Sequence, residues 1–291
     1  TVKEIAPYAF ANTGVTDVNL PSGLETIGDY AFYSATKLVD ITIPGSVKTI
    51  GVGAFRDCWK MTKATLPEGL ETIPRECFIG CRKLESVNIP DSVTTIGNMA
   101  FTGCALKEIN ISKNLTEISI PGYTFSGCPA AITVDAANPN YSADERGVLY
   151  NKDKSLLLHC PNFEKAFTFD INCNIDQYAF YNCANLTDVT FSYAIKKIPY
   201  AAFRNCGSLK ITTVPDTVRM IDQVAFDGCG MTEFYLPDSV EYVGTQAFSS
   251  TPLTHFEFND KVDTFKNIFS ICPKLRTVVV GKGIKKIEIG A

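Results

Sequence analysis

Phenylalanine recurs in this chain at a nearly fixed interval. The steps between successive members of the series are 22, 23, 23, 23, 24, 55, 23, 23, 22 and 21 residues. A fixed period in this range is typical of stacked repeats, in which each unit buries its apolar side chains only against its neighbours. The period therefore predicts a solenoid, which offers long regular faces for binding. The series comprises Phe10, Phe32, Phe55, Phe78, Phe101, Phe125, Phe180, Phe203, Phe226, Phe248 and Phe269.

Each repeat has the same internal order. An apolar residue lies five positions before Phe in ten of the eleven repeats; Ile120 fills this position before Phe125, and Thr264 is the exception. A run of the form Leu-x-x-Ile-x-Ile follows each Phe and often ends at Pro, as in residues 38–44. The alternation predicts a short strand with one buried face, which Pro ends because it cannot donate a ladder hydrogen bond. We expect each coil to hold this strand, a turn, a second extended stretch and a helical or 3₁₀ turn carrying Phe.

The complete motif resembles a known repeat class. Residues 38–58 and 84–104 follow Leu-x-x-Ile-x-Ile-Pro-x-x-Val-x-x-Ile-Gly-x-x-Ala-Phe-x-x-Cys nearly position by position, and this pattern resembles the BspA-like leucine-rich repeats. The resemblance implies an α/β, mostly β fold: a right-handed leucine-rich-repeat solenoid of about twelve coils of about 23 residues. That family is found on many bacterial cell surfaces, including those of gut and oral anaerobes, and on some parasitic protists. The resemblance therefore also implies an extracellular location and adhesion or ligand binding.

The long step between Phe125 and Phe180 marks an insertion at approximately residues 135–165, within a single domain of residues 1–291. In residues 147–158 two apolar runs flank Asn-Lys-Asp-Lys, which predicts a β-hairpin. Residues 138–140, Asn-Pro-Asn, predict a turn upstream of it. The hairpin either packs on the edge of the solenoid or forms a binding protrusion, since insertions in solenoids often lie on one face.

Charge and hydropathy argue against nucleic-acid binding and against a membrane-spanning helix. The net charge of −4 and the pI near 5.3 provide no basic surface for nucleic acid. No apolar run approaches the roughly 18 residues that a membrane-spanning helix needs. The chain starts at Thr1, without Met and in mid-repeat. We therefore expect it to be a segment whose signal or anchor lies outside it.

The eleven cysteines predict a buried column of thiols. Eight of them stand three positions after Phe, where other coils have Thr13, Ala35 or Thr251. Stacked coils would hold parallel Cβ atoms about 4.8 Å apart, beyond the usual disulfide range. We therefore expect reduced thiols, and we expect Cys160 and Cys173, outside the column, to be the more reactive ones.

The sequence contains no recognisable catalytic motif. There are two histidines, and there is no His-Glu-x-x-His zinc motif, glycine-rich phosphate loop or nucleophile elbow. We predict no enzyme activity, no catalytic residue, no cofactor and no metal site.

A candidate binding surface follows from the outward positions of the strands. The later outward position is Thr or Asn in nine of twelve coils, which also suits an ordinary sheet surface. The earlier outward position includes Ile211. Toward the C-terminus the Thr and Asn row ends and larger groups replace it. An exposed tyrosine is a common interface anchor, so we take these larger groups as the candidate ligand-binding residues: Glu233, Tyr235, His255 and Glu257.

The sequence thus predicts a non-enzymatic cell-surface or secreted interaction module. Its expected role is adhesion, by binding a host or bacterial surface protein or a matrix component. One alternative is binding of a carbohydrate, such as a glycan or mucin, with Tyr235 stacked on a sugar ring. Another is a passive structural spacer. A broad, flat ligand footprint would indicate a protein, and a narrow footprint around Tyr235 would indicate a glycan.

Overall fold

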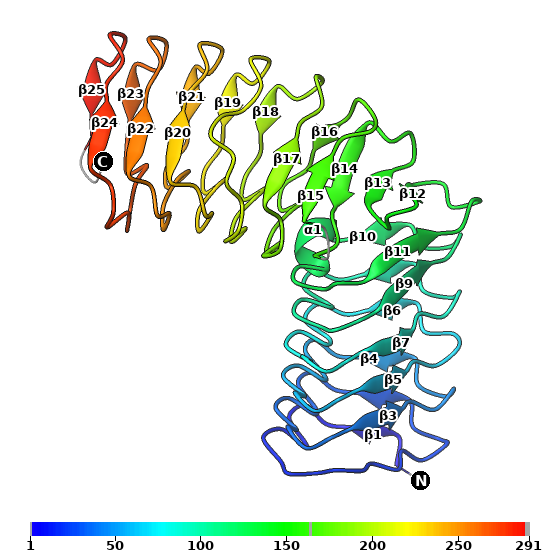
Figure 1. The fold of residues 1–291 in the computed structure, drawn as a ribbon. Helices are drawn as coiled ribbons and strands as arrows, with labels where there is room; N and C mark the ends of the chain where they lie inside the picture. The colour runs from blue at the N-terminus through cyan, green and yellow to red at the C-terminus, as the bar shows by residue number, and fades with distance from the viewer. Residues whose placement is uncertain (1, 163–164, 289–291) are drawn as a thin grey trace. The chain divides into compact units, whose positions relative to one another are not determined.

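Short strands follow one another coil by coil along the chain (Figure 1). The computed structural model describes residues 2–162 and 165–288. It is mostly β with almost no helix and has about thirteen turns, close to the twelve expected. The predicted solenoid is therefore confirmed. The chain divides into two compact units, here called the N-terminal unit (Thr1–Lys152) and the C-terminal unit (Asp153–Ala291).

In the N-terminal unit each regular coil supplies one strand to each of two parallel ladders. The first ladder, built from the Leu-x-x-Ile-x-Ile runs, contains β3 (Asp40–Thr42), β5 (Lys63–Thr65), β7 (Ser86–Asn88), β9 (Glu108–Ile111) and β11 (Ala131–Val134). The second ladder, which precedes Phe in each coil, contains β1 (Glu4–Ile5), β2 (Thr26–Ile27), β4 (Thr49–Ile50), β6 (Thr72–Ile73), β8 (Thr95–Ile96) and β10 (Glu117–Ile118). Within each group of paired strands, equivalent residues pair in register, as Ile41 does with Ala64 and Ala64 with Val87. The paired groups are β3, β5 and β7, then β9 and β11, in the first ladder, and β1, β2 and β4, then β6, β8 and β10, in the second.

The C-terminal unit repeats this arrangement. Its first ladder contains β15 (Ala166–Thr168), β17 (Asp188–Thr190), β20 (Glu233–Tyr235), β22 (His255–Glu257) and β24 (Thr277–Val279). Its second ladder contains β14 (Leu156–His159), β16 (Asn174–Ile175), β18 (Lys197–Ile198), β19 (Met220–Ile221), β21 (Tyr242–Val243), β23 (Thr264–Phe265) and β25 (Lys286–Ile287). The first-ladder strands alternate exposed, buried and exposed residues in β15, β17 and β20, so each places one side chain in the core.

The phenylalanine column is the centre of both cores. In the N-terminal unit the rings of Phe78 and Phe101 stack with centroids 5.8 Å apart, and those of Phe101 and Phe125 stack 6.0 Å apart. Phe101 is 0% exposed, whereas Phe10 is 36% exposed and stacks on Phe32 alone in that column. A buried Phe removes about 150–250 Å² from water, so the column is a major source of stability.

One expected core position, Ile120, is wrong by two residues. Ile118, not Ile120, pairs with Ile96 and is buried. Ile120 instead has φ 47° and precedes the helix α1 (Pro121–Thr124). Proline favours the first turn of a helix, so this coil needs two more residues before its Phe. In the coil of β23, where Thr264 interrupts the apolar series, the adjacent Phe265 is the buried residue.

The insertion begins with an antiparallel pair of strands. β12 (Tyr141–Ala143) pairs with β13 (Leu149–Asn151), and the carboxylate of Asp144 accepts hydrogen bonds from the backbone N–H groups of Arg146 and Val148. Both apolar runs predicted for the hairpin form strands, β13 and β14, with turn residues between them. The sequence did not predict β12, because Tyr-Ser-Ala alone is a weak strand signal.

A buried asparagine fixes the start of this insertion. Asn138 is 0% exposed, and its Nδ2 donates to the carbonyl oxygens of Ser112 at 2.7 Å and Leu115 at 2.9 Å. Its Oδ1 accepts from the N–H groups of Asn140 and Tyr141, both at 2.9 Å. The predicted turn at residues 138–140 is therefore also an anchor to the preceding coil.

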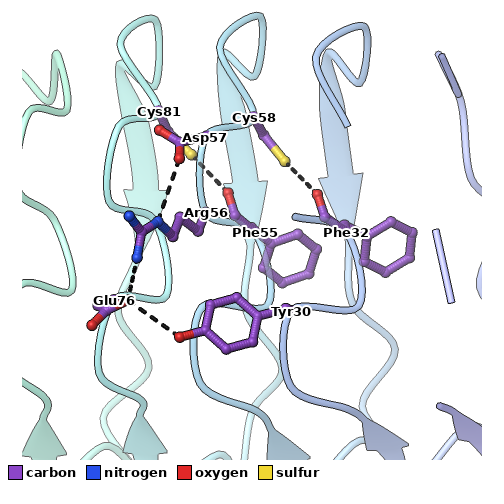
Figure 2. Close-up of polar contacts among 8 residues, drawn as sticks. All are labelled: Tyr30, Phe32, Phe55, Arg56, Asp57, Cys58, Glu76 and Cys81. Carbon is purple, nitrogen blue, oxygen red and sulfur yellow. Dashed lines mark hydrogen bonds and ion pairs between the residues drawn. The ribbon is translucent and has the colours of Figure 1, made fainter. Parts of the chain in front are cut away.

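A polar network crosses three coils of the N-terminal unit (Figure 2). Glu76, which is 7% exposed, accepts from Arg56 Nη1 at 2.6 Å and from the Tyr30 hydroxyl at 3.4 Å. Tyr30 reaches this far because the intervening position is Gly53, where a Cβ would lie 2.4 Å from the Tyr30 ring. The absence of a side chain at Gly53 therefore makes room for the network.

The cysteine column consists of free thiols, and all eleven cysteines are unbridged. Cys58 Sγ donates to the carbonyl of Phe32 at 3.2 Å and Cys81 Sγ to that of Phe55 at 3.1 Å (Figure 2). Small size is thus one requirement of this position, and the thiol adds a hydrogen bond to the preceding coil.

The expected reactivity of the thiols outside the column is wrong. Cys160 and Cys173 are each 1% exposed, and burial raises the pKa of Cys173 to about 11. Cys272 is the one cysteine that is only half-buried. It lies just before β24, whose strand residues are themselves exposed.

Candidate binding surface

The four predicted binding residues lie together on two paired strands of the C-terminal unit. β20 and β22 are parallel and in register, so Glu233 is opposite His255 and Tyr235 is opposite Glu257. Phe234 and Phe256 alternate with them and point into the core, where both are 0% exposed. The period-2 alternation of these strands thus places all four polar side chains on one face, which we call the β20–β22 patch.

The side chains of the β20–β22 patch contact one another. The rings of Tyr235 and His255 lie 5.3 Å apart with an interplanar angle of 43°. The Tyr235 hydroxyl donates to Glu233 Oε2 at 3.3 Å, and His255 Nε2 lies 3.9 Å from Glu257 Oε2. Tyr235 remains 39% exposed, so the cluster is preorganised and still open to a partner.

The charge of the patch is negative. Partial desolvation, followed by the neighbouring carboxylates of Glu233 and Glu257, raises the pKa of Tyr235. The phenol therefore stays protonated at neutral pH and can donate a hydrogen bond. The same carboxylates would favour a cationic group on a partner.

A shallow hollow of about 270 Å³ lies beside the patch. It is lined by Tyr235, Leu236, Asp238, Glu257, Phe258, Asn259 and Asp260. Asp238 and Asp260 extend the acidic character of the patch beyond the ends of the strands. Sequence reasoning missed these two, because they follow the strands rather than lying in the outward rows.

Asn259 is a buried member of the lining of this hollow. It is 6% exposed and donates from Nδ2 to the carbonyl oxygens of Pro237 at 2.6 Å and Val240 at 2.8 Å. Its Oδ1 accepts from the N–H groups of Lys261 and Val262. This is the bonding pattern of Asn138 in the other unit. An Asn at the start of a backbone turn was the available signal, but it is too common in loops to be decisive.

One residue expected on the outward face is buried instead. Ile211 is 7% exposed, and no strand forms at residues 210–215, between β17 and β20 (Figure 1). The residue at the central, inward position of this coil is Thr212, and burying a hydroxyl without a partner is costly. The backbone therefore turns Ile211 inward and leaves Thr212 exposed.

A metal-ligand cluster and a membrane-spanning helix each have a simple structural requirement. Residues 2–162 and 165–288 hold no group of three or more His, Cys, Asp or Glu side chains that could bind a metal ion. Within the same residues, no helix has the length and hydropathy that crossing a bilayer requires.

The repeat pattern matches a known family model. Residues 3–132 and 173–291 match the BspA type leucine rich repeat region, in six copies. The chain belongs to the BspA-type leucine-rich repeat family. No curated protein matches the chain.

Several solved structures, among them leucine-rich repeat proteins, are similar to this chain. A leucine-rich cell surface protein from Faecalibacterium prausnitzii is 27% identical, with a TM-score of 0.66 over 97% of this chain and 83% of that one. A leucine-rich repeat protein from Eubacterium ventriosum shares the fold at 22% identity, with a TM-score of 0.75 over 98% and 84% of the two chains. The pneumococcal vaccine antigen PcpA shares it at 19% identity, with a TM-score of 0.69 over 95% of this chain. The present chain spans 65% of the length of that antigen.

The BspA-type family and its cell-surface relative indicate a protein-interaction or surface module. The β20–β22 patch presents a phenol, an imidazole and two carboxylates on an open strand face.

Proposed function

We propose that this chain is a non-enzymatic, extracellular or cell-surface binding module whose β20–β22 patch contacts a protein ligand, with adhesion as the outcome. The observation that carries the proposal is the exposed, preorganised cluster around Tyr235, in place of the Thr and Asn row found elsewhere. Tyrosine is enriched at protein interfaces because it offers a large apolar ring with one polar end.

The shape of the surface favours a protein over a glycan at this patch. The register continues from β22 to β24, so Thr277 and Val279 extend the two outward rows by one more coil. Val279 is 40% exposed. Three paired strands thus present a continuous face, which suits a protein partner better than a narrow site centred on one ring.

The charge of the surface indicates what the partner presents. Glu233 and Glu257 lie within the patch, and Asp238 and Asp260 lie at its edge. Complementarity then requires a contact surface rich in Lys or Arg. Association should accelerate at low ionic strength, because exposed charges steer the encounter and salt screens them.

The test is a binding screen of the purified chain against immobilised matrix proteins, bacterial surface proteins and mucins, alongside a glycan array. We expect a protein ligand whose affinity falls at least tenfold in Tyr235→Ala, since aromatic anchors dominate interface energies. Tyr242→Ala is the matched control, because Tyr242 is an exposed tyrosine on β21, in the second ladder of the same unit.

Each other outcome has a defined meaning. Binding to glycans alone, abolished by Tyr235→Ala, would replace the protein ligand by the carbohydrate alternative. Equal losses in the Tyr235 and Tyr242 variants would reject the patch as the site. A chain that binds nothing on either array would support the passive spacer.

A further inference from the structure

The first ladder of the C-terminal unit opens where residues 210–215 pass between β17 and β20 (Figure 1). In several coils the residue after the strand donates its N–H to a backbone carbonyl of the next coil. Phe169 donates to the carbonyl of Thr190 at 3.1 Å, and Leu236 donates to that of Glu257 at 3.0 Å. Among the described residues, Phe191 makes no equivalent backbone bond to Thr213.

The opening is confined to one side of this segment. The N–H of Lys210 still donates to the carbonyl of Thr187 at 3.0 Å, and the N–H of Tyr235 donates to the carbonyl of Thr212 at 2.8 Å. The Thr213 hydroxyl donates to the carbonyl of Tyr235 at 3.0 Å. The segment therefore stays attached to β20 and separates only from β17.

The separation leaves a hollow of about 400 Å³ on the strand face. Its polar lining includes the carboxylate of Asp188, the ammonium group of Lys210 and the hydroxyl of Thr212, all exposed. Within the described part of the chain, neither Asp188 nor Lys210 forms an ion pair, and the Thr212 hydroxyl has no hydrogen-bond partner. The apolar lining comes from Phe191 and the buried Ile211.

We propose that this hollow binds one pyranose ring of a carbohydrate. Its volume is at the small end of the range of ligand pockets, about 300–1,000 Å³, which suits a single ring. A sugar presents hydroxyl groups at its rim and C–H groups on its faces. The hydroxyls match the Asp188 carboxylate, the Lys210 ammonium group and the Thr212 hydroxyl. The C–H faces match the apolar surface of Phe191 and Ile211.

An extended peptide does not fit the same opening. A strand inserted into the ladder would require its neighbours to stand about 9.6 Å apart, twice the normal spacing. The coils on either side remain at normal spacing, because Phe203 stacks 4.8 Å from Phe180 and 5.4 Å from Phe226. In the second ladder β18 and β19 also stay paired. The hollow is therefore a local gap in one ladder, which admits a small ligand only.

This site is separate from the β20–β22 patch, and the two can succeed or fail independently. The direct probe is a titration of the ¹⁵N-labelled full chain with glucose, galactose and N-acetylglucosamine, each followed by amide chemical shifts. We expect at least one sugar to shift Phe191, Thr212 and Thr213 with millimolar affinity. Asp188→Asn and Thr212→Val should each weaken this affinity about fivefold, the effect of losing roughly one hydrogen bond.

Thr190→Val is the matched control, since Thr190 is exposed on β17 but lies outside the lining of the hollow. It should leave the affinity unchanged, as should Tyr235→Ala. The proposal is overturned if no sugar shifts these amide signals at concentrations up to about 100 mM. It is equally overturned if Asp188→Asn and Thr212→Val both bind as the parent chain does, or if shifts occur only at β20 and β22.

Discussion

Truncating Phe101 should destabilise the N-terminal unit far more than truncating Phe10, although both occupy the same column. Phe101 is fully buried between the rings of Phe78 and Phe125, so Phe101→Ala removes contacts on both sides. Large-to-small changes of this kind cost about 3–5 kcal/mol. Phe10 is 36% exposed and stacks on Phe32 alone in that column. With less apolar area buried and half the ring partners, Phe10→Ala should cost about 1–2 kcal/mol.

Urea denaturation followed by circular dichroism measures this difference. With an m-value of about 2 kcal/mol per molar urea, the unfolding midpoint should fall by about 1.5–2.5 M in Phe101→Ala and by about 0.5–1 M in Phe10→Ala. Phe101→Leu is the control, because it keeps most of the apolar volume and should cost clearly less than Phe101→Ala. Equal midpoint shifts in the two alanine variants would refute the reasoning that each coil is stabilised by its immediate neighbours.

Three further predictions concern single positions. Burial lowers the pKa of His159 to about 3. Below about pH 6.5 the unfolded chain therefore binds a proton at this histidine that the native chain does not bind. The free energy of unfolding is unaffected by this proton above about pH 6.5 and falls by about 4–5 kcal/mol as the pH drops to about 3. In urea titrations His159→Leu should lose less stability between about pH 7 and about pH 4.5, and an unchanged pH dependence would contradict this. Ile271 is 77% exposed with φ 59°, a conformation that costs a β-branched residue roughly 1 kcal/mol, so Ile271→Asn should raise the melting temperature rather than lower it. Maleimide labelling of the native chain followed by mass spectrometry should modify Cys272 before Cys104, which is 2% exposed, and faster labelling of Cys104 would count against the buried column.

The sequence predicted the coil architecture because the repeat period fixes which residues of neighbouring coils lie at equivalent positions. Phe, the preceding apolar residue and the alternating strand each recur at positions that only stacking can bury together. The same register predicted that Tyr235 and His255 lie on adjacent strands, which the pairing of β20 with β22 confirms. Their role in binding stays a prediction, as does the organisation of residues 1–291 as a single domain.

What the sequence did not predict lies where local chemistry overrides the repeat. Pro121 starts a helical turn and moves the core position from Ile120 to Ile118. Thr212 at an inward position breaks its strand and buries Ile211. The roles of Asn138 and Asn259 depend on carbonyl groups of the preceding coil, and no linear pattern shows which carbonyls a side chain will meet.

The central claim is that the β20–β22 patch is the ligand-binding surface, and a hydrogen-exchange footprint of the chain with its captured protein ligand tests it most directly. The account predicts slowed amide exchange at residues 233–238 and 255–260 in the complex, extending to β24. Exchange at the first-ladder strands of the N-terminal unit should be the same with and without the ligand. Protection confined to the N-terminal unit or to β12 and β13, with unchanged exchange at Tyr235 and Glu257, would contradict the claim.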